Sequence, residues 1–396
     1  MPVPLLDVNA QNHPLQSEFQ AVFERVFQSG HFIMGSEVTA FETEAAALVG
    51  ARHAIGISSG TDAILLALMA LEIGPGDEVL CPAFTFFATA GCVSRVGATP
   101  VFVDVCPVCF NLSIDDAKSK ITSRTKAVIP VHLFGQCADM DGIMALASEH
   151  GLAVIEDAAQ AIGSTYRGSQ AGTLGEFGCY SFFPSKNLGG LGDGGLLVTQ
   201  NDDLAAKAKA LRNHGMEPKY YHSVVGGNFR LDALQAAFLR VKIPHYSQYT
   251  EARRANADEY RERMSKIKGV VSADQNHCQC FEAQSAYLAD AGVKLVLPVA
   301  YSHNGHIWNQ FTLRVLGGKR DDLKKHLSAH GIGCEVYYPL TLDLQECFAA
   351  LPESSRQGCE VAHQLSKEVL SIPIYSELNS GQKDEVVQAV ADWCAV

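Results

Sequence analysis

Lys186 is the residue whose surroundings in the sequence most favour covalent chemistry. It follows the segment Phe182–Ser185 and precedes a cluster of glycines at 189–195. Apolar neighbours desolvate an ammonium and lower its pKa, and such a lysine can act as a nucleophile that forms a Schiff base. Taken alone, the segment also fits a surface lysine in a flexible loop, because most lysines are exposed.

The segment Ser58–Asp62 has the features of an anion site. It follows a short apolar run and opens the stretch Thr61–Leu71, which predicts a helix buried on every side. The first N–H groups of a helix have no partner within it, and the helix dipole adds positive charge at that end. We therefore expect an anion such as a phosphate there, although a plain helix cap explains the same residues.

Asp157 and Gln160 follow the apolar run Leu152–Ile155, which predicts a buried strand. Ligands bind at the carboxyl ends of strands in open α/β sheets, so Asp157 is placed to meet a ligand. A buried carboxylate needs a cationic partner, which a protonated pyridine nitrogen would supply, and Gln160 could reach a neighbouring phenolic oxygen. Capping of the next helix by Asp157 explains this segment equally well.

Short apolar runs alternate with longer amphipathic stretches from residue 54 to residue 199. This alternation predicts strands joined by helical crossovers in a mostly parallel sheet. The clearest connecting helix is Asp139–His150, which Asp139 can cap and Gly151 ends. The predicted strands are Ala54–Ile57, Glu78–Cys81, Pro100–Val103, Ala127–Val131, Leu152–Ile155, Gly178–Phe183 and Gly195–Thr199.

Longer charged stretches follow Asn201 and predict helices, so we expect the sheet domain to end near this point. Beyond Gly269 we expect a smaller α+β unit that contains a strand at Trp308–Val315. Residues 265–291 show the least pattern and predict loops. The helices predicted in this half are Asp203–Arg212, Asp232–Arg240, Tyr249–Lys268, Asp321–His330 and Gly358–Val369.

The glycine cluster contains the spacing G-x-G-x-x-G at Gly190, Gly192 and Gly195. In a dinucleotide site this spacing follows a strand and opens a helix, whose N-terminus binds the pyrophosphate. Here the cluster precedes a strand-like run. We therefore exclude nicotinamide nucleotide binding at these glycines.

The composition of the chain excludes several functions. Lys and Arg number 31 against 43 Asp and Glu, a net charge of −12, so the phosphate neutralisation that dominates nucleic-acid binding has no obvious source. The most apolar segment, Ala63–Leu71, is far shorter than the roughly 20 residues that span a bilayer. We predict neither a nucleic-acid partner nor a membrane.

The 12 cysteines are scattered along the chain, and its first residues lack a secretory signal, so we expect a cytoplasmic protein. The only close cysteine pairs, Cys106 with Cys109 and Cys278 with Cys280, lack the second pair or the histidines that a zinc site needs. We predict no metal site.

Five motif regions follow one another along the chain. They are Ser59–Ala63; Pro82–Phe86 with Ala88–Ala90; Glu156–Gln160; Ser181–Lys186 with Gly192–Gly195; and Gly227–Asp232 with Leu234–Ala237. In this order they resemble the DegT/StrS family of pyridoxal-phosphate-dependent sugar-nucleotide aminotransferases. The likeness extends from about residue 32 to about residue 242, and the segments Val336–Pro339 and Ser371–Tyr375 are similar but less diagnostic.

The resemblance implies an α/β fold of the fold-type I (aspartate aminotransferase-like) class of pyridoxal-phosphate-dependent transferases. It implies a large domain at residues 1–248 with a mostly parallel central sheet, and a smaller C-terminal α+β domain at 249–396. The implied cofactor is pyridoxal 5′-phosphate (PLP). Lys186 would bind it covalently and act as the base, and Asp157 would pair with the pyridine nitrogen. The other implied cofactor-binding residues are Gly60, Thr61 and Ser181 at the phosphate, Asn228 of the other subunit at the phosphate, Gln160 at the ring 3-oxygen and Phe86 over the ring face.

The implied reaction is ping-pong transfer of an amino group from glutamate to a keto sugar nucleotide, in a homodimer with shared active sites. The segments Ser181–Gly195 and Tyr220–Asp232 look closest to family members that act on UDP-2-acetamido-2-deoxy-3-oxo-glucuronate, and a dTDP-keto-deoxyhexose stays open. Relatives with histidine in place of Lys186 carry out dehydration, so the lysine favours transamination. The alternatives are a PLP-dependent dehydratase or eliminase and a non-catalytic regulator that binds a sugar nucleotide.

Five further residues are weaker candidates. Arg230, Tyr338, His306 and Trp308 could each face a substrate, but such residues are more often structural. Arg314 could clamp a donor carboxylate through its guanidinium, or lie at the edge of a sheet in the strand Phe311–Val315.

Overall fold

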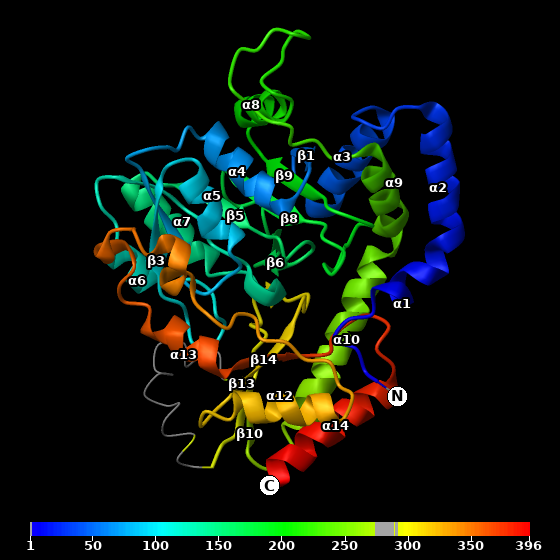
Figure 1. Cartoon of the computed structure of the whole chain (residues 1–396), viewed down its shortest axis with the longest axis vertical. Helices are drawn as coiled ribbons and strands as arrows, with labels where there is room; N and C mark the ends of the chain where they lie inside the picture. Colours follow the sequence, from blue (N-terminus) through cyan, green and yellow to red (C-terminus); the bar gives the residue numbers. More distant parts are fainter. Residues whose placement is uncertain (1, 274–288, 290–291) are drawn as a thin grey trace.

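A central sheet dominates the computed structural model, which describes residues 2–273, 289 and 292–396 (Figure 1). Its strands are β1 (His53–Ile57), β2 (Glu78–Pro82), β3 (Thr99–Val103), β4 (Thr125–Val128), β5 (Ala153–Asp157), β8 (Phe177–Ser181) and β9 (Gly195–Thr199). The spatial order of these seven strands is β1-β9-β8-β5-β4-β2-β3. All neighbours are parallel, except that β9 runs antiparallel to both β1 and β8. The mostly parallel sheet is thus confirmed.

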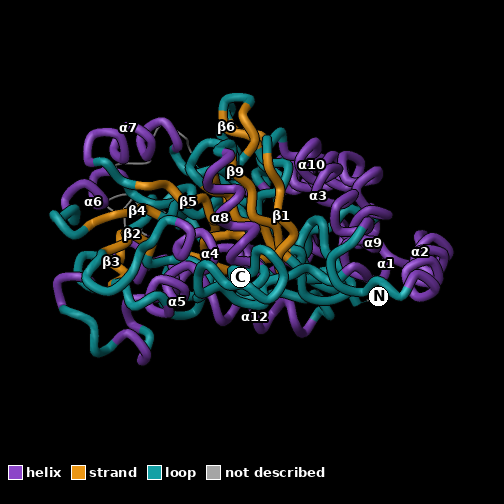
Figure 2. Tube along the Cα trace, turned by 90° about the horizontal axis from the view of Figure 1, so that it is seen from above, coloured by secondary structure: helices purple, strands orange, loops and turns teal. Residues whose placement is uncertain are grey.

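Helices cover both faces of this sheet (Figure 2). One face carries α4 (Gly60–Ala70), α5 (Ala88–Arg95) and α8 (Asp202–Arg212); the other carries α6 (Ile114–Ser119) and α7 (Met140–His150). Strands covered on both faces read as continuous apolar runs, which is why they could be located in the sequence. Every residue of β2 and of β9 is buried.

Helix α4 is buried as the sequence predicts. All residues from Ala63 to Leu68 are buried, and the side chain of Ser59 caps the helix by accepting a hydrogen bond from the backbone N–H of Asp62 at 3.0 Å. An apolar helix inside the protein holds its N-terminus rigidly against the end of β1.

The strands of the large sheet lie within two residues of their predicted bounds, except β4, and two strands differ by three residues at one end. Strand β4 ends at Val128 instead of Val131, because Pro130 has no N–H to continue a ladder. Strand β13 (Phe311–Val315) begins three residues later than predicted. Trp308 has a φ of 52°, a left-handed conformation that is incompatible with a strand.

A second, smaller sheet lies in the C-terminal part, with the order β10-β11-β13-β14. Its remaining strands are β10 (Val270–Ser272), β11 (Leu295–Leu297) and β14 (Val369–Ile372). The long helix α10 (Tyr246–Met264) runs from the large sheet's side of the molecule to this unit (Figure 1). Helices α12 (Arg320–Ala329), α13 (Glu360–Glu368) and α14 (Ser380–Ala395) accompany the smaller sheet.

The remaining elements pack around these two units. Near the N-terminus, Val3 forms a β-bridge with Ile332 of the C-terminal unit. A small sheet of order β12-β6-β7 contains β6 (Thr165–Tyr166), β7 (Ser169–Gln170) and β12 (Asn304–Gly305). The other α-helices described are α1 (Val8–Asn12), α2 (Gln16–Ser29), α3 (Ser36–Val49) and α9 (Ala233–Lys242), and the short 3-10 turns are His13–Leu15, Leu133–Gly135, Ile243–His245, Leu342–Leu344, Glu346–Phe348 and Glu353–Ser355.

Three other expectations meet the structure differently. Of the loops predicted at 265–291, residues 270–272 form a strand instead, and most of the rest, with Cys278 and Cys280, lies outside the described residues. The division into domains at 248/249 falls within α10 and stays a proposal. Among the residues that the structure describes, no helix combines the length and apolarity needed to cross a bilayer.

Candidate active site

The predicted site residues meet at one edge of the central sheet. Strands β1, β5 and β8 belong to this sheet, and each has a predicted residue at or shortly after its last residue. Gly60 follows β1, Asp157 is the last residue of β5 and Ser181 is the last residue of β8. Antiparallel β9 starts at this same edge, where Gly195 pairs with Ser181. The carboxyl edge of a doubly covered sheet is where ligands bind in such folds.

Asp157 is a buried acid with a side-chain oxygen held in place. Its Oδ2 accepts a hydrogen bond from Thr89 Oγ at 2.8 Å, and its Oδ1 accepts one from the backbone N–H of Ala159 at 3.2 Å. Burial raises the pKa of Asp157, while the hydrogen bonds and the positive charge of Lys186 act in the opposite direction. A carboxylate in this position is stabilised further by any cation placed against it.

The neighbouring acid, Glu156, points to the other face of β5 and is fully engaged. His132 Nδ1 accepts a hydrogen bond from the backbone N–H of Ala138, so His132 Nε2 carries the proton and donates to Glu156 at 2.8 Å. Glu156 therefore fixes the loop after β5 and the loop after β4. Its other partners are the backbone N–H groups of Gly172, Leu174 and Gly175, each at 2.7 Å.

Lys186 is half-buried in the turn that follows β8. Its backbone N–H donates to Phe183 O at 2.8 Å, while its amine has no hydrogen-bond or ion-pair partner within the described part of the chain. Burial lowers its pKa from 10.5 to about 8, and the negative charge of Asp157 acts in the opposite direction. At pH 8 a large share of this amine is thus unprotonated and can act as a nucleophile or base.

Ser59, Gly60 and Ser181 form a narrow cradle with Gly195. A Cβ on Gly60 would lie 2.8 Å from Ser181 Cβ, and one on Gly195 would lie 2.4 Å from the carbonyl carbon of Ser59, so neither position has room for a side chain. The first intrahelical hydrogen bond of α4 runs from Ala63 N to Ser59 O. The N–H groups of Gly60 and Thr61 precede it and remain available to an anion.

Gln160 and Phe86 both adjoin Tyr338. Gln160 Oε1 accepts a hydrogen bond from the backbone N–H of Phe134 at 2.7 Å, and its Nε2 donates to Tyr338 Oη at 3.2 Å, which leaves one amide N–H for a ligand. The ring of Phe86 lies 6.3 Å from that of Tyr338 and is 58% exposed. Its exposure leaves a ring face open to a flat ligand.

Asn228 is exposed and lies in the segment that leads from the loop after α8 into α9. The next residue, Phe229, accepts a hydrogen bond from Ser58 N at 3.0 Å, and Arg230 forms a bridge with Ile57. The structure therefore brings residues 229 and 230 to the end of β1, while Asn228 forms a bridge with Asn213. Arg230 itself donates to Asn213 Oδ1 at 2.7 Å.

Both expectations for Arg314 are wrong. It lies on β13, which has neighbours on both sides, so it is no edge residue. Its guanidinium is buried against Glu368 at 2.6 Å and donates to Pro107 O, so it does not face a donor carboxylate. His306 and Trp308 stack at 3.9 Å in the interior, in structural positions.

Sequence reasoning missed the partners that hold these residues. Thr89 belongs to one of the five motif regions and His132 follows β4, but neither local pattern indicates a role. Both side chains are buried, and each binds an acid that is distant in the sequence, Asp157 for Thr89 and Glu156 for His132. No local sequence signal identifies such pairs.

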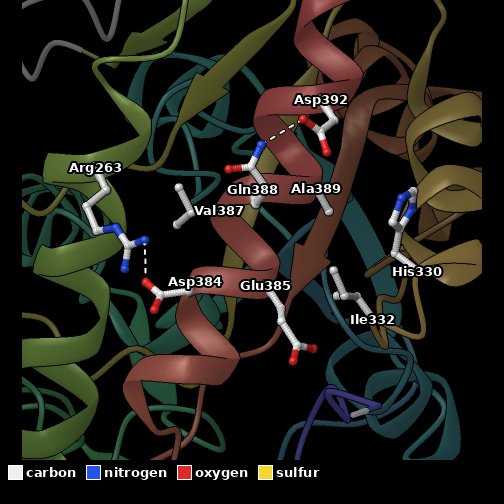
Figure 3. A pocket seen from close by; sticks show the side chains of 9 residues that line it. All are labelled: Arg263, His330, Ile332, Asp384, Glu385, Val387, Gln388, Ala389 and Asp392. Carbon is white, nitrogen blue, oxygen red and sulfur yellow. Dashed lines mark hydrogen bonds and ion pairs between the residues drawn. The ribbon is translucent and has the colours of Figure 1, made fainter.

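The groove in Figure 3 is a separate feature of the molecule. It has a volume of about 640 Å³ and is lined by α14 together with parts of α10 and the end of α12, including Arg263, His330 and Asp384. None of the predicted site residues lines it, and α14 lies at the opposite end of the molecule from α4 (Figure 1). Among the described residues, no group of three His, Cys, Asp or Glu side chains is placed to hold a metal ion.

The chain is similar to curated proteins over nearly its whole length. It is 45% identical to a "pleiotropic regulatory protein" of Geobacillus stearothermophilus (99% of both chains), and 44% identical to a UDP-N-acetyl-3-dehydro-α-D-glucosamine 3-aminotransferase of Acidithiobacillus ferrooxidans (96% of this chain, 95% of that protein). It is 36% identical to a UDP-2-acetamido-2-deoxy-3-oxo-D-glucuronate aminotransferase of Pseudomonas aeruginosa (96% of both).

Solved structures share the fold. DesV of S. venezuelae, crystallised in complex with a ketimine intermediate, has a TM-score of 0.90 and 38% identity, covering 100% of this chain and 99% of DesV. NtdA of Bacillus subtilis, with bound cofactor PMP, has a TM-score of 0.87 and 29% identity, covering 100% and 86% of the two chains. Residues 14–391 match the profile of the DegT/DnrJ/EryC1/StrS aminotransferase family. A partly buried amine, a buried acid and an anion cradle at one sheet edge are thus found in a chain that belongs to the DegT/DnrJ/EryC1/StrS aminotransferase family.

Proposed function

We propose that the chain is a PLP-dependent aminotransferase that transfers an amino group from glutamate to a keto sugar nucleotide. The observation that carries this proposal is the Lys186 amine, which has a pKa of about 8, no partner among the described residues, and Asp157 as the charge that acts on it. Family membership and the PMP bound by NtdA support the cofactor.

The residues present fit this cofactor. The cradle has room only for glycine at Gly60 and Gly195, and its unpaired N–H groups together with Ser181 suit a phosphate dianion. Asp157 is a buried acid that has no cation in hydrogen-bond contact among the described residues, and it suits a protonated pyridine nitrogen. Gln160 and Phe86 would hold the ring oxygen and one ring face.

When bound, PLP supplies an electron-withdrawing ring that stabilises negative charge on the carbon beside the amino group. Lys186 would hold the cofactor through its amine, and the same amine would serve as the base for the proton at that carbon. Asp157 keeps the positive charge on the ring nitrogen, and Thr89 holds Asp157 in the orientation for doing so. The glycine cradle would hold the phosphate independently of Lys186.

The proposed acceptor is a nucleotide-linked 3-keto sugar, and we test UDP-2-acetamido-2-deoxy-3-oxo-glucuronate first. The relatives at 44% and 36% identity are named for 3-keto UDP sugars, which supports the UDP class. A dTDP-keto-deoxyhexose is the second acceptor to test. The proposed compartment is the cytoplasm, on the basis of the scattered cysteines.

The proposed assembly is a homodimer in which Asn228 completes the partner's site. The loop before Asn228 projects from the body (Figure 1), and its Tyr220 and Val225 are 77% and 90% exposed. Phe183 and Leu191 are also exposed beside Lys186. Exposed apolar residues next to a site are typical of interfaces.

Subunit mixing tests this assembly. Lys186→Ala and Asn228→Ala are each expected to have low activity as pure proteins. If the sites are shared, unfolding and refolding an equal mixture restores one intact site per mixed dimer, up to about a quarter of wild-type activity. A mixture no more active than the average of its components would show that Asn228 serves its own subunit.

The function itself is tested spectroscopically. Reconstitution with PLP is expected to give the absorption of lysine-bound cofactor, which Lys186→Arg, a variant that keeps the charge, lacks. Glutamate should convert that absorption, and a 3-keto UDP sugar should restore it. Release of ammonia or water without a glutamate half-reaction would instead support elimination or dehydration. Sugar-nucleotide binding without turnover over a broad panel would support a regulator, the role named for the relative at 45% identity.

A further inference from the structure

Asn187, the residue directly after Lys186, is anchored to a distant part of the chain. It is 2% exposed, and its Nδ2 donates to Ile307 O at 3.0 Å. Its Oδ1 accepts a hydrogen bond from Asn309 Nδ2 at 2.7 Å. These partners lie 120 and 122 residues further along the sequence.

The orientation of both amides follows from their partners. Ile307 O is an acceptor, so Asn187 must present its N–H group there and its oxygen to Asn309. Asn309 must then donate, which leaves its own Oδ1 buried and without a partner in the part of the chain that the structure describes. An unsatisfied buried oxygen is unfavourable for stability, so the pair is not explained by stability alone.

The same turn, residues 306–309, also holds the residue that orients Gln160. Ile307 N donates to Gly135 O at 3.0 Å, and Asn309 N donates to Phe134 O at 2.8 Å. Phe134 N in turn donates to Gln160 Oε1 at 2.7 Å. One turn is therefore bonded on one side to the neighbour of Lys186 and on the other to the loop that fixes Gln160.

We propose that Asn309 is a positioning residue, which through Asn187 fixes the backbone of Lys186 relative to Gln160 and Asp157. This inference rests on the proposed function. Lysine has a flexible four-carbon stem, so the place of its amine depends on how firmly its backbone is held. Without the Asn309 bond the segment is free to relax toward solvent, and misplacement of a reacting group by about 1 Å slows a reaction by roughly 100-fold.

The test variant is Asn309→Leu, which has similar size and no charge and cannot donate to Asn187. The matched control is Asn304→Leu. Asn304 Nδ2 also donates to a backbone carbonyl, that of Cys137 at 3.0 Å, and its Oδ1 is likewise buried and unpaired, but it does not contact Asn187. Thermal unfolding of each variant shows whether the fold is retained.

The first readout uses the protein without cofactor. Limited acylation at a series of pH values, followed by mass spectrometry of the peptide that contains Lys186, gives the pH midpoint of its reactivity. Asn309→Leu is expected to raise that midpoint by about half a pH unit or more, since a relaxed amine is better solvated. Asn304→Leu is expected to leave it unchanged.

The second readout is the rate constant of the glutamate half-reaction. Asn309→Leu is expected to lower it about 10-fold or more, with PLP affinity changed less than about threefold because the phosphate cradle is untouched. Asn187→Leu should act through the same bond, so the double variant should be no slower than the slower single variant.

The inference is overturned if Asn309→Leu and Asn304→Leu give the same results in both readouts, whether both resemble wild type or both are impaired. Should Asn309→Leu not fold, Asn309→Ala, which is smaller and likewise cannot donate, takes its place with the same expected loss of rate. A wild-type protein that gives no lysine-bound cofactor absorption would contradict the proposed function instead, whereas a normal wild type beside an unaffected variant contradicts only the role of Asn309.

Discussion

Two lysines with the same lowered pKa lie in different surroundings. Burial lowers the pKa of Lys186 and that of Lys242 to about 8 each. Lys242, near the end of α9, donates to Gly189 O at 2.7 Å and to Asn12 Oδ1 at 3.0 Å. Lys186 has no such partner among the described residues. A lowered pKa therefore identifies burial, and the absence of partners within the described residues distinguishes the proposed reactive amine from the structural one.

The two acids of β5 repeat this contrast. Glu156 accepts from His132 and three backbone N–H groups, whereas Asp157 accepts from Thr89 and one backbone N–H. Successive residues of a strand point to opposite faces, so neighbouring acids serve opposite sides of the sheet. The acid with fewer partners is the one that faces Lys186.

Replacing Lys186 should have the largest effect. Lys186→Ala is expected to lower amino transfer by roughly 10⁴-fold, because attachment and proton transfer both depend on its amine. Lys242→Met should keep the absorption of lysine-bound cofactor. Steady-state rates and absorbance spectra of both variants test the comparison. If Lys186→Ala and Lys242→Met lost that absorption equally, the hydrogen bonds of Lys242 would not distinguish it from Lys186.

Asp157→Asn should have the next largest effect. Removing the charge should lower the rate roughly 10² to 10³-fold, as for other losses of preorganised electrostatic stabilisation. The loss of stability should be smaller than for Glu156→Gln, because the amide oxygen can still accept from Thr89 and only the bond from the Ala159 N–H is lost. Glu156→Gln should do the reverse, because its N–H₂ cannot accept the bonds that Glu156 now accepts. It should lower the free energy of unfolding by about 2–4 kcal/mol while leaving the rate per folded molecule near wild type.

Urea unfolding combined with single-turnover rates separates these two outcomes. A large rate loss in Glu156→Gln at conditions where it is folded would place both acids in the chemistry. The expected contrast is between a rate effect on one face of β5 and a stability effect on the other.

How far the sequence predicts this site depends on the distance between partners in the chain. Asp157, Gln160 and Lys186 could be placed because each follows a recognisable strand, and their position at the sheet edge follows from that. Thr89 and Asn309 could not, because they bind partners 68 and 122 residues away. A hydrogen bond between side chains so far apart leaves no repeating pattern in the local sequence from which it could be predicted.

Arg314 also shows that local sequence does not reveal long-range pairing. Its strand was predicted, and so was the helix that carries Glu368. That the two elements lie side by side and neutralise each other across 54 residues could not be read from either one. The expectation that Arg314 could clamp a donor carboxylate is wrong because tertiary pairing with Glu368, and not local sequence, decides what this charge faces.

Lys242 gives a pH-dependent stability that its replacement should remove. Its folded pKa of about 8 lies below the ordinary value of 10.5, so the unfolded chain binds more protons between these values. Its contribution to stability therefore rises with pH from about 8 to 10.5, by up to about 1.4 kcal/mol per pH unit. In denaturant unfolding across this pH range, the free energy of unfolding of the wild type should increase relative to that of Lys242→Met as the pH rises. A constant difference between the two would mean that Lys242 is not desolvated in the folded protein.

Phe86→Ala should have the smallest effect, and it sharpens the comparison because Phe86 is exposed where the two lysines are not. A 58% exposed ring contributes little to folding, so the free energy of unfolding should change by less than about 0.5 kcal/mol. If Phe86 covers the cofactor ring, losing one aromatic contact of about 1 kcal/mol should weaken PLP binding about fivefold. Equilibrium titration with PLP measures this change, and Phe27→Ala, at a 61% exposed phenylalanine of α2, is the control. Unchanged PLP affinity in Phe86→Ala would contradict the role of Phe86 and would favour Tyr338 as the residue that covers the cofactor ring. The ring of Tyr338 lies next to that of Phe86.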